Sequence, residues 1–193
     1  MIAIFGGSFD PVHFGHLNLA TQVQDELEFE EFIFLPCGEP PHKEKLLFSQ
    51  NKRLKILNLA LNNSSKFMIS DYEFNGKISY TIDTLRYFNK KYKNICFIMG
   101  SDSFMDMPNW EHYLEFKNLI NILVIDRGVE ITNLCEFQKT TNIDEFKNTI
   151  GKVYFFKNEL INISSTIIRS KILQQENLSG FVPENIIKYI KNL

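Results

Sequence analysis

Two histidines, His13 and His16, stand three positions apart in the stretch GGSFDPVHFGH at residues 6–16, directly after the apolar run MIAIF. Imidazoles at this spacing can bind a metal ion, or they can donate hydrogen bonds to an anion such as phosphate. A zinc site requires a third protein ligand, and Asp10 is near, but the glycines and proline around it indicate a turn that brings backbone close to a ligand. A plain strand-to-helix turn with surface histidines is the third alternative.

A phosphate group accounts for more of the residues in this stretch. Gly6 and Gly7 allow close approach of the main chain and unusual φ, which frees amide groups to point at an anion. A helix expected to start near Phe14 presents the positive end of its dipole to the same place. Both imidazoles could then donate to phosphate oxygens. The stretch is neither a Walker A loop nor a dinucleotide fingerprint, because G-K-[ST] and G-x-G-x-x-G are absent.

A second stretch with phosphate chemistry, ISSTIIR at residues 163–169, lies near the other end of the chain. Ser164, Ser165 and Thr166 are expected at the start of a helix, where hydroxyls and free N–H groups gather. Ser165 and Arg169 are four apart and share a helix face. A phosphate at this helix end would meet hydroxyl, amide and guanidinium together. The alternative is a plain N-cap with Arg169 in solvent.

A loop with a basic end follows the second apolar run, in PCGEPPHK at residues 36–43. The proline pair stiffens this loop. His42 and Lys43 then place two basic side chains at the end of the loop, where they could contact a phosphate. A solvated basic loop, with Lys45 close by, is the alternative.

Hydroxyls and an aromatic ring characterise two further stretches. In ISYTIDTL, residues 78–85, Ser79 or Tyr80 would cap a helix and Thr81 would lie in its first turn, where a hydroxyl suits a carboxylate. The alternative is that these hydroxyls only cap the helix.

The stretch GSDSFMDMPNW, residues 100–110, follows a buried strand. Asp102 is placed to accept hydrogen bonds from a ribose diol. Trp110, the single tryptophan, either stacks on a substrate ring or anchors the core.

The elements that must position these residues alternate between strand and helix. Short apolar runs predict strands at 2–5, 32–36, 67–70, 95–100, 121–126 and 152–156. Apolar residues three or four apart predict helices between them, with stripes formed by Leu17, Ala20, Val23 and Leu27, by Leu54, Leu57 and Leu61 after a possible N-cap at Ser49, and by Ile82, Leu85, Phe88 and Tyr92. This alternation predicts an α/β fold, a doubly wound and mostly parallel sheet with helices on both faces. Ligands of such sheets bind at the carboxyl ends of the strands.

Outside the sheet, the stretch 128–148 is polar and predicts only a weak helix near 143–150, within a variable connection. We expect two helices in the tail from residue 163, separated by NLSGFVP, and a single domain over 1–193 whose C-terminal part, about 163–193, is helical.

Bulk composition narrows the classes of partner. The chain has 193 residues and a formal net charge of -2, which argues against a general nucleic-acid binder. No stretch is apolar enough to predict a membrane span, and no signal peptide is visible. The three cysteines, Cys37, Cys96 and Cys135, lack the spacing of a disulfide framework. We therefore expect a cytoplasmic protein with reduced thiols; its oligomeric state is open.

The two phosphate stretches closely resemble the paired signatures of the nucleotidyltransferases that carry an H-x-G-H motif, a family with a Rossmann-like sheet. With PPHK, SYTIDTL and the Trp110 stretch, the chain is most similar to the bacterial nicotinate-nucleotide adenylyltransferases, which join nicotinate mononucleotide to ATP. The resemblance implies an ATP site, with Mg2+ bridging the phosphates, formed by Gly6, Gly7, Ser8, Phe9, His13, His16, Gly100, Asp102, Ser164, Ser165 and Arg169. His13, His16 and Arg169 would be catalytic.

The resemblance also implies a site for nicotinate mononucleotide, formed by His42, Lys43, Thr81, Trp110 and Glu111. Two positions depart from the family pattern. Glu111 stands where several members have an aromatic residue, so it would contribute its backbone N–H and point its side chain outward. DRGV replaces Arg-Pro-Gly after the fifth apolar run, with Arg127 as a phosphate or structural residue. The alternatives are a sibling enzyme for nicotinamide mononucleotide, phosphopantetheine or a cytidylyl group, or a nucleotide-binding module without catalysis.

Overall fold

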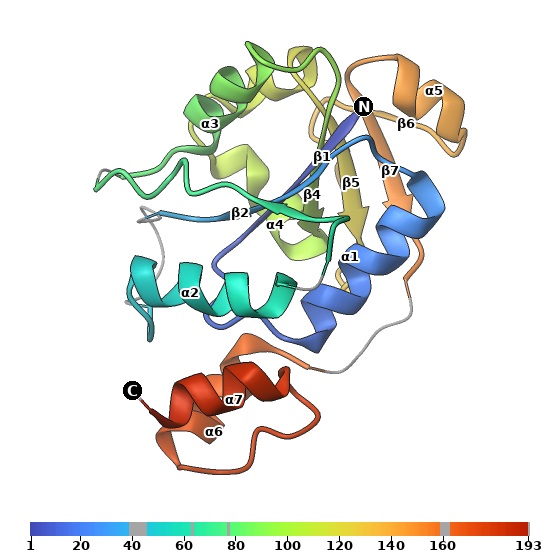
Figure 1. The fold of residues 1–193 in the computed structure, drawn as a ribbon. Helices are drawn as coiled ribbons and strands as arrows, with labels where there is room; N and C mark the ends of the chain where they lie inside the picture. The colour runs from blue at the N-terminus through green and yellow to red at the C-terminus, as the bar shows by residue number, and fades with distance from the viewer. Residues whose placement is uncertain (39–45, 63, 77, 159–162, 193) are drawn as a thin grey trace.

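A parallel β-sheet forms the frame of the protein in the computed structural model, which describes residues 1–38, 46–62, 64–76, 78–158 and 163–192 (Figure 1). Its strands are β1 (Ile2–Gly7), β2 (Phe32–Pro36), β3 (Met68–Ile69), β4 (Ile95–Gly100), β5 (Asn121–Ile125), β6 (Gln138–Lys139) and β7 (Lys152–Phe156). They pair in the order β3-β2-β1-β4-β5-β7-β6, and every pair is parallel. The strand order reverses between β1 and β4, which is where a doubly wound sheet binds its ligands. The predicted fold class is confirmed.

Helices cover both faces of the sheet. They are α1 (Phe14–Leu27), α2 (Gln50–Leu61), α3 (Thr81–Asn89), α4 (Ser101–Asp106), α5 (Ile143–Asn148), α6 (Ser165–Leu173) and α7 (Glu184–Lys191), with 3-10 turns η1 (Met107–Asn109) and η2 (Tyr113–Asn118). Alternate strand residues face opposite ways, so that Phe5 packs in one core cluster with α1, α2, α6 and α7, and Ile4 in another with α3 and α4. Burial on both faces explains why the strands are continuously apolar.

The predicted apolar stripes hold for α3 and differ by one position in α2. Ile82, Leu85 and Phe88 are buried in α3, as predicted. In α2, which has Ser49 at its N-cap, Leu57 and Leu61 are buried, but Arg53 is buried in place of Leu54. The helix is turned because the Arg53 guanidinium finds backbone carbonyls to bind, as described below.

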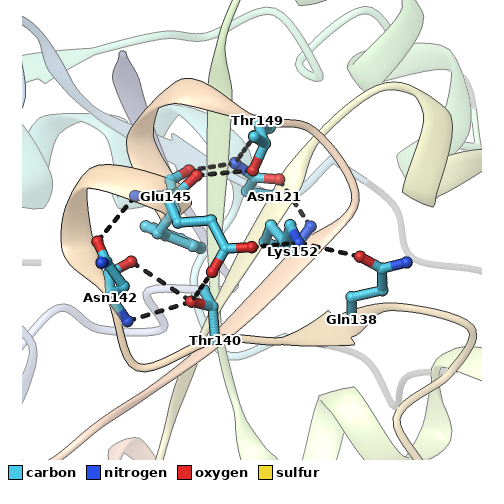
Figure 2. Close-up of polar contacts among 8 residues, drawn as sticks. Asn121, Gln138, Thr140, Asn142, Glu145, Thr149 and Lys152 are labelled. Atoms are coloured by element: carbon cyan, nitrogen blue, oxygen red, sulfur yellow. Dashed lines mark hydrogen bonds and ion pairs between the residues drawn. The ribbon is translucent and has the colours of Figure 1, made fainter.

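Side-chain hydrogen bonds order the stretch that we predicted as a variable connection (Figure 2). Asn121, buried at the start of β5, donates from Nδ2 to the carbonyls of Phe146 at 2.5 Å and Thr149 at 2.6 Å, and its Oδ1 accepts from the Lys152 amide at 2.9 Å. The carboxylate of Glu145 accepts from Lys152 Nζ at 2.5 Å. These bonds attach α5 to the sheet, and the short strand β6 is attached by its pairing with β7.

The last two helices lie at the end of the molecule to which the arrows of β5 and β7 point (Figure 1). This end holds the carboxyl ends of the strands. Helix α7 packs on α2, and Asn185 Nδ2 donates to the carbonyl of Leu59 at 2.7 Å. The predicted pair of tail helices is therefore present, and it places α6 beside the turn after β1. Among the described residues, no helix is long and apolar enough to cross a membrane.

Candidate active site

The last two residues of β1, Gly6 and Gly7, are packed against aromatic rings, and the turn follows directly after them. A Cβ on Gly6 would lie 2.7 Å from Phe97 Cζ, and one on Gly7 would lie 3.1 Å from Phe9 Cζ. Neither glycine is among the described residues with positive φ, whereas Phe9 has φ 43°. The predicted unusual φ at the glycines is therefore wrong. Their missing side chains make room for rings, and the left-handed residue of the turn is Phe9.

Asp10, the nearest carboxylate to the histidines in sequence, is fully buried and already hydrogen-bonded. It accepts from the amides of Leu47 at 2.8 Å and Phe48 at 2.9 Å. This carboxylate therefore holds the segment before α2 against the turn. Within the described ranges, no three His, Cys, Asp or Glu side chains group so as to hold a metal ion.

His13 and His16 stack on each other at the start of α1, with ring centroids 3.7 Å apart. His13 is the N-cap residue, so α1 begins at Phe14 as predicted. Burial, with a smaller effect of the Arg127 charge, lowers the pKa of His13 to about 4. Burial also holds the pKa of His16 well below its ordinary value, followed by the effects of His13 and Arg127. Both imidazoles are therefore neutral at pH 7, and each carries one N–H.

The Nδ1 atoms of His13 and His16 are buried without a hydrogen-bond partner among the described residues. Buried polar atoms are normally paired, so these two are a departure that a polar ligand at the ring edges could explain. A Cβ on Gly15 would lie 3.0 Å from His13 Nδ1 and Cε1, so a side chain at this position would crowd the ring.

Helix α6 lies directly against the turn between β1 and α1, which is called the histidine turn because it leads into His13 and His16. Ser165 Oγ donates to the carbonyl of Pro11 at 3.0 Å, and Arg169 Nη1 donates to the carbonyl of Asp10 at 3.1 Å. Ser164 is the N-cap, and its Oγ accepts from the Ile167 amide at 3.3 Å. The two phosphate stretches are thus adjacent in space. Arg169 is bonded to the turn, unlike the solvated arginine of the alternative.

The carboxyl end of β4 carries an exposed ion pair. Arg127 Nη1 lies 3.4 Å from Asp102 Oδ2, and the Arg127 amide donates to Ser101 Oγ at 3.0 Å. A Cβ on Gly100 would lie 2.3 Å from Asp102 Oδ1 and 2.6 Å from Arg127 Nε. Glycine at this position therefore gives room to the carboxylate of Asp102 and the guanidinium of Arg127.

Of the residues predicted to bind the second nucleotide, three lie in the described part of the chain. Thr81 is the first residue of α3 and is half-buried; Tyr80 is the N-cap and its side chain makes no capping hydrogen bond. Trp110 is half-buried, and its Nε1 donates to Asp106 Oδ2 at 3.1 Å. The Glu111 carboxylate is exposed and lies 3.3 Å from His112 Nε2, pointing outward as expected. His42 and Lys43 lie outside the described residues.

Sequence reasoning missed Arg53, which connects the two loops that follow β1 and β2 at the carboxyl end of the strands. Its Nη1 donates to the carbonyl of Ser8 at 2.7 Å and its Nη2 to that of Cys37 at 2.8 Å. The only signal in the sequence is a cation beside an apolar stripe, which ordinarily indicates a solvated helix face.

The comparisons with known proteins all point to nucleotidyltransferases. A family model described as cytidylyltransferase-like matches residues 4–171. A protein of Vesicomyosocius okutanii subsp. Calyptogena okutanii (strain HA), named a probable nicotinate-nucleotide adenylyltransferase, is 40% identical over 199 residues, covering 100% of this chain and 95% of its own. One of Clostridium novyi (strain NT) with the same name is 40% identical over 186 residues, covering 94% and 91%.

A solved structure described as Plasmodium falciparum nicotinic acid mononucleotide adenylyltransferase complexed with NaAD is similar in fold. Its TM-score is 0.78 at 20% sequence identity, over 99% of this chain and 94% of that one.

Proposed function

The chain belongs to the cytidylyltransferase-like family and, within it, to the nicotinate-nucleotide adenylyltransferases, and from this premise we propose that it transfers the adenylyl group of ATP to nicotinate mononucleotide. The products are deamido-NAD and pyrophosphate, in NAD biosynthesis. One observation carries the proposal for this chain: α6 places Ser165 and Arg169 on the turn that holds His13 and His16, beside the point where the strand order reverses.

The reaction requires positioning and charge stabilisation more than acid–base chemistry. A phosphate oxygen of nicotinate mononucleotide, already anionic at neutral pH, forms a bond to the α-phosphorus of ATP. The bond from that phosphorus to the bridging oxygen of pyrophosphate breaks, and pyrophosphate leaves with the electron pair. No protein nucleophile is needed, so the enzyme acts by orienting the two nucleotides and stabilising negative charge on the transferring group.

We assign ATP to the turn after β1 and the start of α6. The N–H groups of His13 and His16 donate to oxygens of the reacting phosphate. Amides of Gly6 and Gly7, at the end of β1, and of Ser8 and Phe9, in the turn that follows, line the same site. Ser164, Ser165 and Arg169 bind the β and γ phosphates. Arg127 adds a positive charge that already acts on both histidines. Gly100 leaves room for Asp102, whose carboxylate accepts hydrogen bonds from the ribose.

We assign nicotinate mononucleotide to the carboxyl ends of β2 and β4. Thr81, at the start of α3, reads the nicotinate carboxylate, because a hydroxyl and free amides gather there. Trp110 stacks on the pyridine ring, and Glu111 contributes its backbone N–H. His42 and Lys43 bind the phosphate, an assignment that rests on the sequence.

The metal ion and the cellular location are two further parts of the proposal. The family uses ATP and a divalent metal ion, and we propose that Mg2+ would enter with ATP as part of the substrate complex and would neutralise charge on its phosphates. We also propose a cytoplasmic location, which is supported by the thiols of Cys96 and Cys135, since neither forms a disulfide within the described part of the chain.

Pyrophosphate release tests the proposal. The full chain is incubated with Mg2+ and ATP, and nicotinate mononucleotide, nicotinamide mononucleotide or phosphopantetheine is offered separately. We expect the highest kcat/KM with nicotinate mononucleotide. A higher value with either other acceptor identifies a sibling enzyme, and ATP binding without pyrophosphate release identifies a module without catalysis.

A further inference from the structure

Arg53, in α2, is almost completely buried among backbone carbonyls of two loops. Besides its bonds to the carbonyls of Ser8 and Cys37, Nη2 lies 3.4 Å from the carbonyl oxygen of Gly38. The guanidinium carbon is 4.9 Å from the centre of the Phe74 ring, which adds a cation–π contact. One side chain therefore joins the turn after β1 to the segment after β2.

Glu73 makes the complementary connection on the other side of that segment. Its side chain is buried, and its Oε2 accepts from the Gly38 amide at 3.1 Å. Its Oε1 accepts from Thr84 Oγ1 at 2.7 Å, and Thr84 is buried in α3. Glu73 therefore joins the segment after β2 to the helix that begins at Thr81.

The Gly38 residue is held from both ends by this pair. Its N–H is donated to Glu73, and its carbonyl faces Arg53. A Cβ on Gly38 would lie 2.3 Å from the backbone oxygen of Glu73, so only glycine fits. The position of this segment is thus fixed by two buried, charged side chains.

The stability of the fold does not by itself require buried charged side chains at Arg53 and Glu73. Arginine keeps its charge when buried, and a hydrophobic side chain of similar volume commonly gives an equally or more stable core. In the part of the chain that the structure describes, Arg53 forms no ion pair, and its guanidinium binds backbone carbonyls instead. The carbonyls that it binds belong to the loops that carry the proposed substrate sites.

We propose that Arg53 and Glu73 are positioning residues that set the distance between the two nucleotides. The inference rests on the proposed adenylyl transfer. Arg53 fixes the histidine turn relative to Gly38, and Glu73 fixes Gly38 relative to α3. The two reacting atoms must approach to about 3–3.5 Å, and a misplacement of about 1 Å can lower the rate about 100-fold.

The test compares Arg53→Met with Lys55→Met, a matched change of a cation at an exposed position on the same helix. Calorimetry gives the Kd of nicotinate mononucleotide and of a non-hydrolysable ATP analogue, each alone, and pyrophosphate release gives kcat per folded molecule. We expect Arg53→Met to lower kcat about 10- to 100-fold while each Kd changes less than about threefold. Arg53→Lys keeps the positive charge but lacks the planar guanidinium that binds two carbonyls at once. It should recover part of the rate.

A purely structural role predicts a different pattern. Arg53→Met would then reduce the folded fraction, seen by near-UV circular dichroism, while kcat per folded molecule stayed within about twofold of Lys55→Met; that result overturns the inference. So does a loss of rate that weaker binding of one nucleotide explains. Should Arg53→Met not fold, Glu73→Gln is measured instead, and the same split between kcat and Kd is expected.

Failure of the proposed function gives a separate result. A wild-type protein that releases no pyrophosphate with nicotinate mononucleotide rejects that function directly. An active wild-type protein with an equally active Arg53→Met variant rejects only the positioning role.

Discussion

Arg169 Nη1 donates a hydrogen bond of 3.1 Å to the backbone carbonyl of Asp10, 159 positions earlier in the chain. The same nitrogen lies 4.0 Å from Asp10 Oδ2, and that carboxylate holds the amides of Leu47 and Phe48. Arg169 therefore fixes α6 to the turn that carries the histidines, while its side chain remains about one-third exposed. A partly exposed guanidinium one turn beyond a helix start is suited to polyphosphate.

Replacement of Arg169 by alanine should remove a charged phosphate contact and loosen α6. We expect kcat/KM for ATP to fall about 10²- to 10³-fold, the loss typical of one donor to a developing charge. Lys171→Ala is the control, because Lys171 lies on the same helix and pairs at 2.6 Å with Glu176, which follows the end of that helix. Equal kcat/KM in the two variants, from pyrophosphate release at varied ATP, would contradict the assignment.

His16 tests whether an imidazole N–H acts on the transferring phosphate. His16→Ala should lower kcat about 10²- to 10³-fold, because a pre-oriented donor is lost where charge develops. His16→Asn keeps an N–H donor and should retain more activity than alanine. Single-turnover measurements separate this chemical step from product release. Near-normal turnover of His16→Ala would refute the role.

Stability should fall as the pH drops from about 6.5 toward 4, because His13 resists protonation in the folded protein. Its folded pKa is about 4, whereas an unfolded histidine titrates near 6.5. In that range the unfolded chain binds more protons, which favours unfolding. The full effect of His13 amounts to about 3 kcal/mol below pH 4, and His16 acts in the same direction.

Urea unfolding of wild type and His13→Gln between pH 4.5 and 7.5 measures this effect. The difference between the two proteins cancels the titration of the carboxylates that both share. We expect a shallower decline of the free energy of unfolding in the variant. Parallel pH curves would show that His13 is not desolvated.

Much of the fold could be predicted from sequence because burial of a parallel sheet on both faces leaves continuous apolar runs. Six strands match their runs, and the alternation with helices gives the doubly wound order. Strand β6 could not be found this way: Gln138 and Lys139 are exposed and polar, and a pair of ladder bonds leaves no hydrophobic pattern.

The site shows where spacing fails as a guide. The resemblance to the H-x-G-H nucleotidyltransferases implied one site formed by both phosphate stretches, and the hydrogen bonds of Ser165 and Arg169 show that the two stretches lie side by side. The conformation of Gly6 and the burial of Arg53 depend on partners far away, the Phe97 ring and the carbonyls of Ser8 and Cys37. Only the three-dimensional contacts reveal which neighbour takes the space beside a glycine or receives a buried cation.

Gly100→Ala tests the space occupied by the Asp102–Arg127 pair. The added methyl group would collide with both side chains, since its carbon would lie 2.3 Å from Asp102 Oδ1. We expect the Kd for ATP to rise about tenfold, as one good hydrogen bond to the ribose is lost. Ser103→Ala, two residues beyond Ser101 in α4, serves as control. Calorimetry that gives the same Kd for both variants would contradict the role of Asp102.

Asn121 should contribute strongly to stability and little to catalysis. Asn121→Ala leaves the carbonyls of Phe146 and Thr149 and the amide of Lys152 without partners in a buried place (Figure 2). We expect a loss of about 2–4 kcal/mol in the free energy of unfolding. Because Asn121 begins β5, it lies at the amino end of the strands, and the histidine turn lies at their carboxyl end. The kcat at 20 °C should therefore not change.

The matched control for that variant is Asn148→Ala. Asn148 is exposed, and its Nδ2 donates to the Asp144 carbonyl at 2.8 Å, so its loss should cost less than about 0.5 kcal/mol. Urea unfolding of the two variants measures the difference. Equal stabilities would show that water replaces the hydrogen bonds of Asn121. A lower kcat in folded Asn121→Ala would show that the amino end of the strands influences the site.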